Sequence, residues 1–184
     1  MSNVLKWMSW EGGIDLVAAT SPGLQAPNII IHLGRMVHTP AGSAASGMIL
    51  WQPNPQLAPL VMGFVSTDEA TAKYFGPNIF AGTPFEHAPV FTAAISIFIN
   101  TSIAIATCEV NGYIFKVEMT DFSEPYLINR PPAAMPPFYQ QGVELHAKKV
   151  TLAVNGQSIP LYIPPVGITG GPASVVSPNG IYAR

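Results

Sequence analysis

Charged side chains are scarce in this sequence. Asp, Glu, Lys and Arg make up 10% of the 184 residues, against about 25% in typical soluble domains. The eight lysines and arginines are scattered, and only Lys148 and Lys149 are adjacent. Because a nucleic-acid interface needs clustered basic side chains to meet the phosphates, we predict that nucleic acid is not a partner.

The low charge also bears on self-association. The net charge at pH 7 is −2, which gives copies of the chain little mutual repulsion in solution. We therefore predict a homo-oligomer, since most soluble oligomers are assemblies of identical chains. The alternative is a monomer whose surface is polar but neutral.

Disulfides and a secretion signal are missing as well. With a single cysteine, Cys108, the chain cannot form an intrachain disulfide, so it lacks the framework of small secreted domains. The first residues, Met1–Gly13, show no signal-peptide core because Glu11 and two glycines interrupt the apolar residues. We expect a cytoplasmic protein.

A membrane helix is not expected either. The segment from His87 to Cys108 carries no Asp, Glu, Lys or Arg, but Asn100-Thr101-Ser102 interrupts it and apolar residues alternate with small polar ones. A spanning helix would show a continuous apolar run instead. Membrane association is therefore not predicted, although such alternation is also found in membrane-inserting β-hairpins.

Catalytic and nucleotide-binding motifs are absent from the sequence. It contains no GxSxG, GxxxxGK[ST], GxGxxG or HExxH pattern and no EF-hand loop. The glycines of Gly167–Gly171 resemble a phosphate-binding loop only in composition, because no lysine and no helix follow. We predict no cofactor and no metal site.

The sequence does contain clear strand periodicity. Apolar residues alternate through Ile29–His38 and again through Val90–Thr120, as in half-buried strands. Asn111-Gly112 and Asn155-Gly156 are typical of two-residue hairpin turns, because both residues tolerate positive φ. The first turn places Val110 opposite Tyr113. We predict a mainly β fold, an antiparallel β-barrel or β-sandwich with one short helix and Pro-rich arms.

The helix is expected after Ser66. Ser66-Thr67-Asp68-Glu69 matches a capping box, in which the Ser66 hydroxyl accepts from the Glu69 amide. Gly76-Pro77 would end the helix after about nine residues.

One domain accounts for the whole chain, and proline use divides it. Proline lacks an amide donor, so proline-rich segments are expected outside regular sheet. The predicted parts are an N-terminal segment (1–27), core strands (28–124), a Pro-rich link (125–142), a C-terminal hairpin (143–163) and an extended tail (164–184).

Both faces of Val90–Val110 are apolar or small. If the chain turns through Asn100-Thr101-Ser102, Ile99 pairs with Ile103 and the isoleucines share one face. The other face then carries small residues such as Ala104 and Cys108. We expect both faces to be covered, by a core and by a second sheet, an arm or another subunit. Small residues could instead line a ligand cavity in a barrel.

Four residues are candidates for a catalytic site. His32 has an apolar strand face beside it and Arg35 nearby, and could act as an acid or base; a histidine bonded into the structure is the alternative. Glu86 and His87 lie between Pro84 and Pro89, in the loop best suited to function, or in a solvated turn. Cys108 is expected to be a buried, inert thiol.

These observations favour a non-catalytic β-barrel or β-sandwich protein that acts by ligand binding or self-assembly. An apolar small molecule would be its ligand. The alternatives are a small barrel enzyme of the isomerase, cyclase or hydratase type acting on an apolar ligand, and a structural subunit of a larger particle.

Overall fold

The computed structural model describes residues 5–24, 26–133 and 136–184. Parts of the predicted N-terminal segment (1–4 and 25) and of the predicted Pro-rich link (134–135) lie outside the described residues. The described strands are β1 (Trp7–Ala18), β2 (Ile29–Thr39), β3 (Gly42–Trp51), β4 (Val61–Ser66), β5 (Val90–Thr92), β6 (Ala94–Ile99), β7 (Ile103–Val110), β8 (Tyr113–Phe122), β9 (Tyr126–Arg130), β10 (Tyr139–Val154), β11 (Gln157–Ile159) and β12 (Ser174–Ala183). A short helix α1 (Glu69–Lys73) and a π-helical turn η1 (Phe75–Ile79) follow β4.

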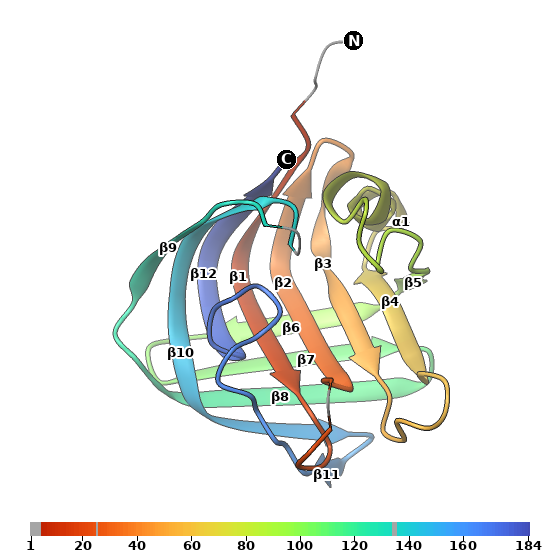
Figure 1. Cartoon of the computed structure of the whole chain (residues 1–184), viewed down its shortest axis with the longest axis vertical. Coiled ribbons are helices and arrows are strands. Elements are labelled where there is room, and N and C mark those ends of the chain that lie inside the picture. Colours follow the sequence, from red (N-terminus) through yellow and green to blue (C-terminus); the bar gives the residue numbers. More distant parts are fainter. Residues whose placement is uncertain (1–4, 25, 134–135) are drawn as a thin grey trace.

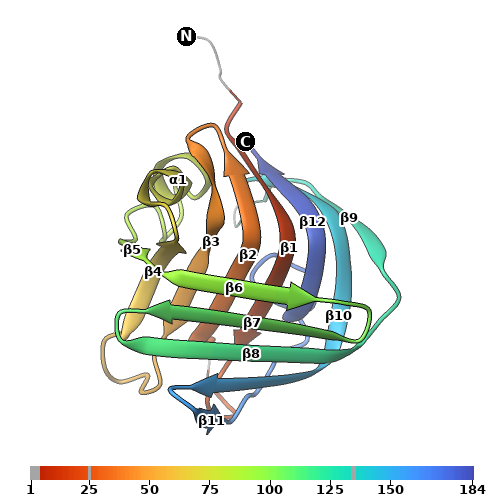
Figure 2. The ribbon, with the colours of Figure 1, turned by 180° about the vertical axis from the view of Figure 1, so that it is seen from behind.

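The strands form one sheet that is nearly closed into a barrel. Along the main path the order is β5-β4-β3-β2-β1-β12-β10-β8-β7-β6, and β9 and β11 both pair with β10. Figure 1 shows β6, β7 and β8 running across the back of the β1–β4 layer, and Figure 2 shows the same crossing from behind. Only β4 and β5 pair in parallel in the described sheet. The predicted antiparallel barrel or sandwich with one short helix is confirmed.

The β1–β2 part of the sheet carries a core on each face. The main core lies between the crossing layers and includes Ile14, Leu16, Ile31, Leu33, Ala104, Ala106 and Cys108. A second, smaller core includes Trp10, Ile30, Phe64, Phe75, Phe138 and Tyr182. Because side chains alternate along a strand, Asp15 and His32 point away from the main core, towards the second one.

The two Asn-Gly hairpin turns are confirmed. Asn111 and Gly112 have φ of 51° and 79°, and Asn155 and Gly156 have φ of 50° and 79°, as a type I′ turn requires at both central positions. The first turn places Val110 opposite Tyr113, as the sequence predicts.

The predicted isoleucine pairing between β6 and β7 is wrong. Ile99 pairs with Ala104 and Ile97 with Ala106, so the connection is one residue longer than the predicted turn. The Asn100 side chain explains the extra residue, because its Oδ1 accepts from the Ser102 amide at 2.8 Å and from the Ile103 amide at 2.9 Å.

This register turns the small residues of β7 into the core and its isoleucines outward. Ala104, Ala106 and Cys108 are buried and pack in the main core. On the opposite face, Phe98 of β6 is 56% exposed. The expectation that both faces are covered is therefore wrong for the single chain.

The observed helix α1 is shorter than predicted, and a different residue caps its N-terminus. Asp68 is its N-cap, and Asp68 Oδ1 accepts from the Thr71 amide at 2.8 Å. Ser66 belongs to β4, where its carbonyl accepts from the Ala93 amide at 2.8 Å, so Ser66 cannot begin the helix. The α-helix has five residues, and η1 extends it through Gly76-Pro77.

The predicted link and tail both contribute strands. β9 and the start of β10 fall within the predicted Pro-rich link, so the expectation that this segment lies outside regular sheet is wrong. Within the predicted extended tail, β12 lies between β1 and β10. Pro178 of β12 lies where the β10–β12 register shifts, between Val143 and Leu145. Proline has no backbone N–H to donate to the neighbouring strand, which explains a bulge at this point.

Candidate functional site

Two adjoining cavities lie on the sheet face that carries the second core. The polar cavity has a volume of about 20 Å³, and its lining includes Asp15, His32, Gln140, Glu144, Ser177 and Tyr182. The apolar cavity has a volume of about 140 Å³ and is lined by His32, Met48, Phe80, Thr83, Pro84, Phe85, Pro136, Phe138, Ile168, Thr169 and Tyr182. His32 and Tyr182 line both cavities, so they form the boundary between them.

The strand register places these side chains in a row. Asp15 of β1 pairs with His32 of β2, His32 with Met48 of β3, and Met48 with Phe64 of β4. Directly paired residues on one face lie about 4.5–5.5 Å apart at Cβ. The row therefore changes from an acidic to an apolar side chain within four strands, with His32 between the two environments.

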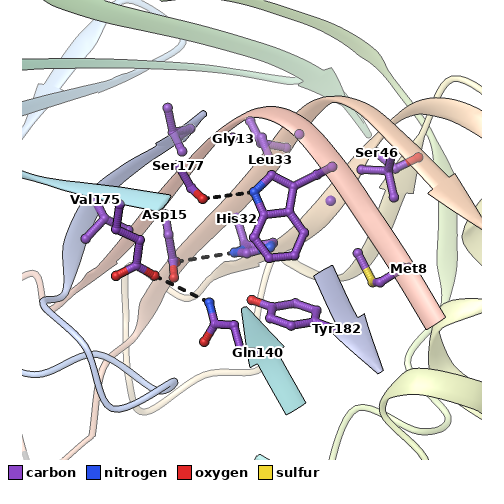
Figure 3. Close-up of a pocket in the computed structure, with 16 residues that line it drawn as sticks. Met8, Gly13, Asp15, His32, Leu33, Ser46, Gln140, Val175, Ser177 and Tyr182 are labelled. Atoms are coloured by element: carbon purple, nitrogen blue, oxygen red, sulfur yellow. Dashed lines mark hydrogen bonds and ion pairs between the residues drawn. The ribbon is translucent and has the colours of Figure 1, made fainter. Parts of the chain in front are cut away.

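His32 and Asp15 form a dyad in which the carboxylate is buried and the imidazole is partly exposed. The distance from His32 Nδ1 to Asp15 Oδ1 is 3.6 Å, and a dashed line marks this contact in Figure 3. Asp15 is 8% exposed, and in the described part of the chain its Oδ1 is the one buried side-chain oxygen or nitrogen without a hydrogen-bond partner. An unpartnered buried carboxylate oxygen is costly, and the His32 imidazole is the ion-pair partner that the structure gives it.

A second ion pair closes the other side of the polar cavity. Arg130 Nη1 donates to Glu144 Oε1 at 2.8 Å and Arg130 Nη2 donates to Glu144 Oε2 at 2.7 Å. Gln140 Oε1 accepts from Arg130 at 2.9 Å, and the Tyr126 hydroxyl donates to Glu144 at 3.1 Å. The Glu144 side chain is 3% exposed, and it lies at the bulge opposite Pro178, a place where strands re-aim side chains.

These neighbours change the titration of His32. Burial lowers the pKa of His32, but the nearby Asp15 carboxylate, with a further contribution from Glu144, outweighs that effect and leaves the pKa above 6.5. The His32 side chain is nevertheless 24% exposed, and that surface faces the cavities. An imidazole with a raised pKa is protonated over more of the neutral range, so it is suited to donate a proton.

Tyr182 stays neutral beside the same groups. Burial, together with the Asp15 and Glu144 carboxylates, raises the pKa of Tyr182 well above 10. No dashed line joins its hydroxyl to the other residues drawn in Figure 3. The hydroxyl is thus a neutral donor next to the polar cavity.

Aromatic rings build the wall of the apolar cavity. The Phe138 and Tyr182 ring centroids are 4.3 Å apart, those of Phe80 and Phe138 are 5.7 Å apart, and those of Phe80 and Phe85 are 6.3 Å apart. Phe80 and Phe85 come from the loop after η1, where the Thr83 hydroxyl donates to the Phe80 carbonyl at 2.6 Å.

A loop of the predicted tail covers the site. Ile168 and Thr169 contribute to the cavity wall, and the Gly167 amide donates to the Gly171 carbonyl at 2.7 Å. A Cβ at Gly171 would collide with the Arg130 guanidinium, so glycine permits this close approach. The loop passes in front of β1 and β12 in Figure 1.

The residues singled out from the sequence lie at different places. His32 lines both cavities, whereas Arg35 is exposed and lines neither. Glu86 Oε2 accepts from the Gly82 amide at 2.6 Å, and the His87 side chain is 91% exposed. Glu86 and His87 therefore lie in the loop that supplies the aromatic wall, but His87 points into solvent.

Sequence reasoning missed most of the site. Asp15, Arg130, Gln140, Glu144 and Tyr182 are not among the sequence candidates. A signal was present for two of them, because Asp15 follows Ile14 and precedes Leu16, and Glu144 stands between Val143 and Leu145. A lone carboxylate within an apolar strand indicates a buried partner.

Within the described ranges, no group of three or more His, Cys, Asp or Glu side chains could hold a metal ion. Nor does this part of the chain contain a helix with the length and apolar character needed to cross a membrane.

Comparisons with known proteins give little further information. No family model matches the chain, and no curated protein matches it. Among solved structures, the crystal structure of acetoacetate decarboxylase from Legionella pneumophila subsp. pneumophila str. Philadelphia 1 is similar, with a TM-score of 0.38 and 11% identity, over 97% of this chain and 84% of that chain. At this TM-score the likeness is too weak to assign a family or an activity.

Proposed function

We propose that this chain is a small barrel enzyme that binds an apolar small molecule in the apolar cavity and transfers a proton to or from it through His32. Asp15 would hold the imidazole in place, and Tyr182 would donate a hydrogen bond. The reactions that need only such groups are isomerisations, cyclisations and hydrations or dehydrations.

The main support for this proposal is that His32 lines both the polar and the apolar cavity. A ligand site is typically an apolar cavity with a few polar groups that fix the ligand's orientation. General acid–base catalysis requires a titratable group within reach of the ligand and a pKa near the working pH. His32 meets the first requirement by lining the apolar cavity, and the raised pKa supports the second.

Asp15 has the role that a carboxylate often plays beside a catalytic histidine. Bonded to Nδ1, it would fix the tautomer and leave Nε2 for the ligand. The 3.6 Å separation does not argue against this role, because catalytic hydrogen bonds are often long before the ligand binds.

Ligand binding without chemistry is the second candidate. The apolar cavity by itself supports it, since the wall is mostly aromatic and aliphatic. Self-association and a role in a larger particle stay predictions from the low charge of the sequence.

The two candidates differ in a measurable way. Acetophenone is a suitable probe, because its methyl hydrogens exchange with solvent when the ketone enolises and because a cavity of about 150 Å³ accommodates a benzene ring. We expect the wild-type chain to accelerate deuterium exchange of this methyl group in D₂O. Neutral His32 would take the proton from the methyl carbon at Nε2, Tyr182 would donate a hydrogen bond to the enolate oxygen, and the imidazolium would return a deuteron after exchange with solvent. His32→Gln should lose most of this acceleration, a loss of about 10²-fold or more.

Binding to each variant is checked separately through the resonances of acetophenone itself, by saturation transfer from the protein, because a variant that replaces Met48 carries no label at that position. Met48→Trp should fill the cavity and abolish acetophenone binding, whereas Met36→Trp, at an exposed position of β2, should leave it unchanged. Binding without accelerated exchange would leave the protein as a ligand carrier, and absence of binding would refute both candidates.

A further inference from the structure

The charges around the cavities balance in pairs. Arg130 neutralises Glu144 through two hydrogen bonds, and His32, when it is protonated, neutralises Asp15. The tyrosines at the cluster, Tyr126 and Tyr182, stay neutral because burial raises the pKa of each, that of Tyr126 to about 12. The walls therefore offer no uncompensated charge to a ligand.

Charged side chains on the surrounding elements make hydrogen bonds or ion pairs outside the apolar cavity. Glu86 accepts from the Gly82 amide, and Arg184 donates to the carbonyls of Ile79 and Ala81. Glu11 and His38 pair with each other at 3.3 Å on the rim of β1 and β2. A charged ligand would thus enter the apolar cavity without a counter-charge and would lose its hydration there.

Two donors lie at the boundary between the two cavities, because His32 and Tyr182 line both of them. With Nδ1 of His32 directed to Asp15, imidazole geometry turns Nε2 away from that carboxylate, and no contact of Nε2 is drawn in Figure 3. The Tyr182 hydroxyl is the second donor, and the two rings lie 6.2 Å apart at an angle of 23°. A single acceptor oxygen at this boundary would meet donors but no uncompensated charge.

We propose that the apolar cavity selects small neutral compounds that carry one acceptor oxygen, such as a ketone or an aldehyde, and rejects carboxylates and amines of the same size. This inference rests on the proposed function, because it concerns the ligand of the same cavity. It narrows the substrate class to carbonyl compounds that bind through one acceptor oxygen.

A matched ligand series tests this selectivity on the full chain. Acetophenone, benzoate, benzylamine and ethylbenzene share one ring and differ in the attached group. Titrations at pH 6, where His32 is mainly protonated because its pKa lies above 6.5, are followed through methyl-labelled Met48 and should give the lowest Kd for acetophenone. Ethylbenzene, which lacks the acceptor, should bind about fivefold or more weakly, and benzoate and benzylamine tenfold or more weakly.

His32→Gln gives a reciprocal check. Removing the cation leaves Asp15 unpaired, so the variant should prefer benzylamine over benzoate more strongly than the wild type does, while acetophenone loses affinity. Circular dichroism establishes that the variant is folded, and the wild-type series decides the outcome if the variant is not.

The outcomes of these titrations test the ligand selectivity separately from the proposed function. Tighter binding of benzoate or benzylamine than of acetophenone, or equal binding of ethylbenzene, would overturn the selectivity while the cavity remains a ligand site. If none of the four compounds binds, the proposed function fails as well.

Discussion

Arg130 and Glu144 hold β9 and β10 together through a bidentate pair beside the polar cavity. The Glu144 side chain is 3% exposed and that of Arg130 is 20% exposed, so water screens the pair poorly. Because burial desolvates both charges, such a pair contributes little net stability while it is intact. Removing one partner, however, leaves the other charge buried without compensation.

We therefore expect Arg130→Met to destabilise the protein by about 3–5 kcal/mol. The double variant Arg130→Met/Glu144→Leu should recover much of this loss, because neither charge then remains buried. Urea unfolding of the three proteins, followed by circular dichroism, measures the free energies. A double variant no more stable than the single one would show that the stranded Glu144 charge is not the cause.

Lys73→Met provides the surface control for this comparison. Lys73 Nζ lies 2.7 Å from Glu69 Oε1, a distance as short as in the buried pair, but the two side chains are 64% and 63% exposed. Loss of this pair should cost less than about 1 kcal/mol.

The second prediction concerns the dyad. Asp15→Asn removes the nearest negative charge from His32 while it keeps the size of the side chain, so the pKa of His32 should fall. Histidine side-chain nitrogen resonances recorded against pH give the titration directly. Asp121→Asn is the matched control, since Asp121 lies on the surface beside Lys148 and Lys149. Equal titration of His32 in the wild type and in Asp15→Asn would refute the dyad.

Stability should follow the protonation of His32. The pKa in the folded chain lies above 6.5, so protonation favours the folded state. This contribution is complete below the unfolded pKa of about 6.5 and is lost as the pH rises through the folded value. The difference in unfolding free energy between the wild type and His32→Gln should therefore shrink with rising pH. A constant difference would contradict this prediction.

The exposed His87 supplies the control for this pH series. His87→Gln changes a side chain that is 91% exposed, so it should alter the unfolding free energy by less than about 0.5 kcal/mol.

Local signals in the sequence predicted much of the fold. The Asn-Gly turns fix hairpins through two neighbouring residues that accept positive φ, so Val110 and Tyr113 pair as expected. The Asn100 turn was mispredicted because Asn100 bonds two following amides, which lengthens the connection by one residue. One extra residue reverses which side chains of β7 face the core.

The site was less predictable, because its residues meet only through long-range pairing. Asp15 and His32 are brought together by the β1–β2 register, and Glu144 by a bulge beside Pro178. Sequence periodicity identifies the faces of single strands but not which strands adjoin. The position of β12 between β1 and β10 therefore could not be foreseen from a proline-rich segment near the end of the sequence.

Self-association is the fourth prediction, based on the low charge of the chain. We expect the molar mass from light scattering to exceed that of one chain and to rise with concentration. A mass equal to one chain at every concentration would refute the homo-oligomer.

The last prediction uses Cys108 as a reporter of opening of the main core. Cys108 is 0% exposed, and burial raises the pKa of its thiol to about 12. Since only the thiolate reacts, Cys108 should resist a disulfide reagent at pH 8 in the folded protein and react fully in urea. Ser96→Cys in a Cys108→Ala background places the thiol on the exposed face of β6 and should react at once. Equal rates for the two thiols in the folded state would mean that β7 leaves the core readily, and the small-residue packing of Ala104, Ala106 and Cys108 would not hold the two layers together.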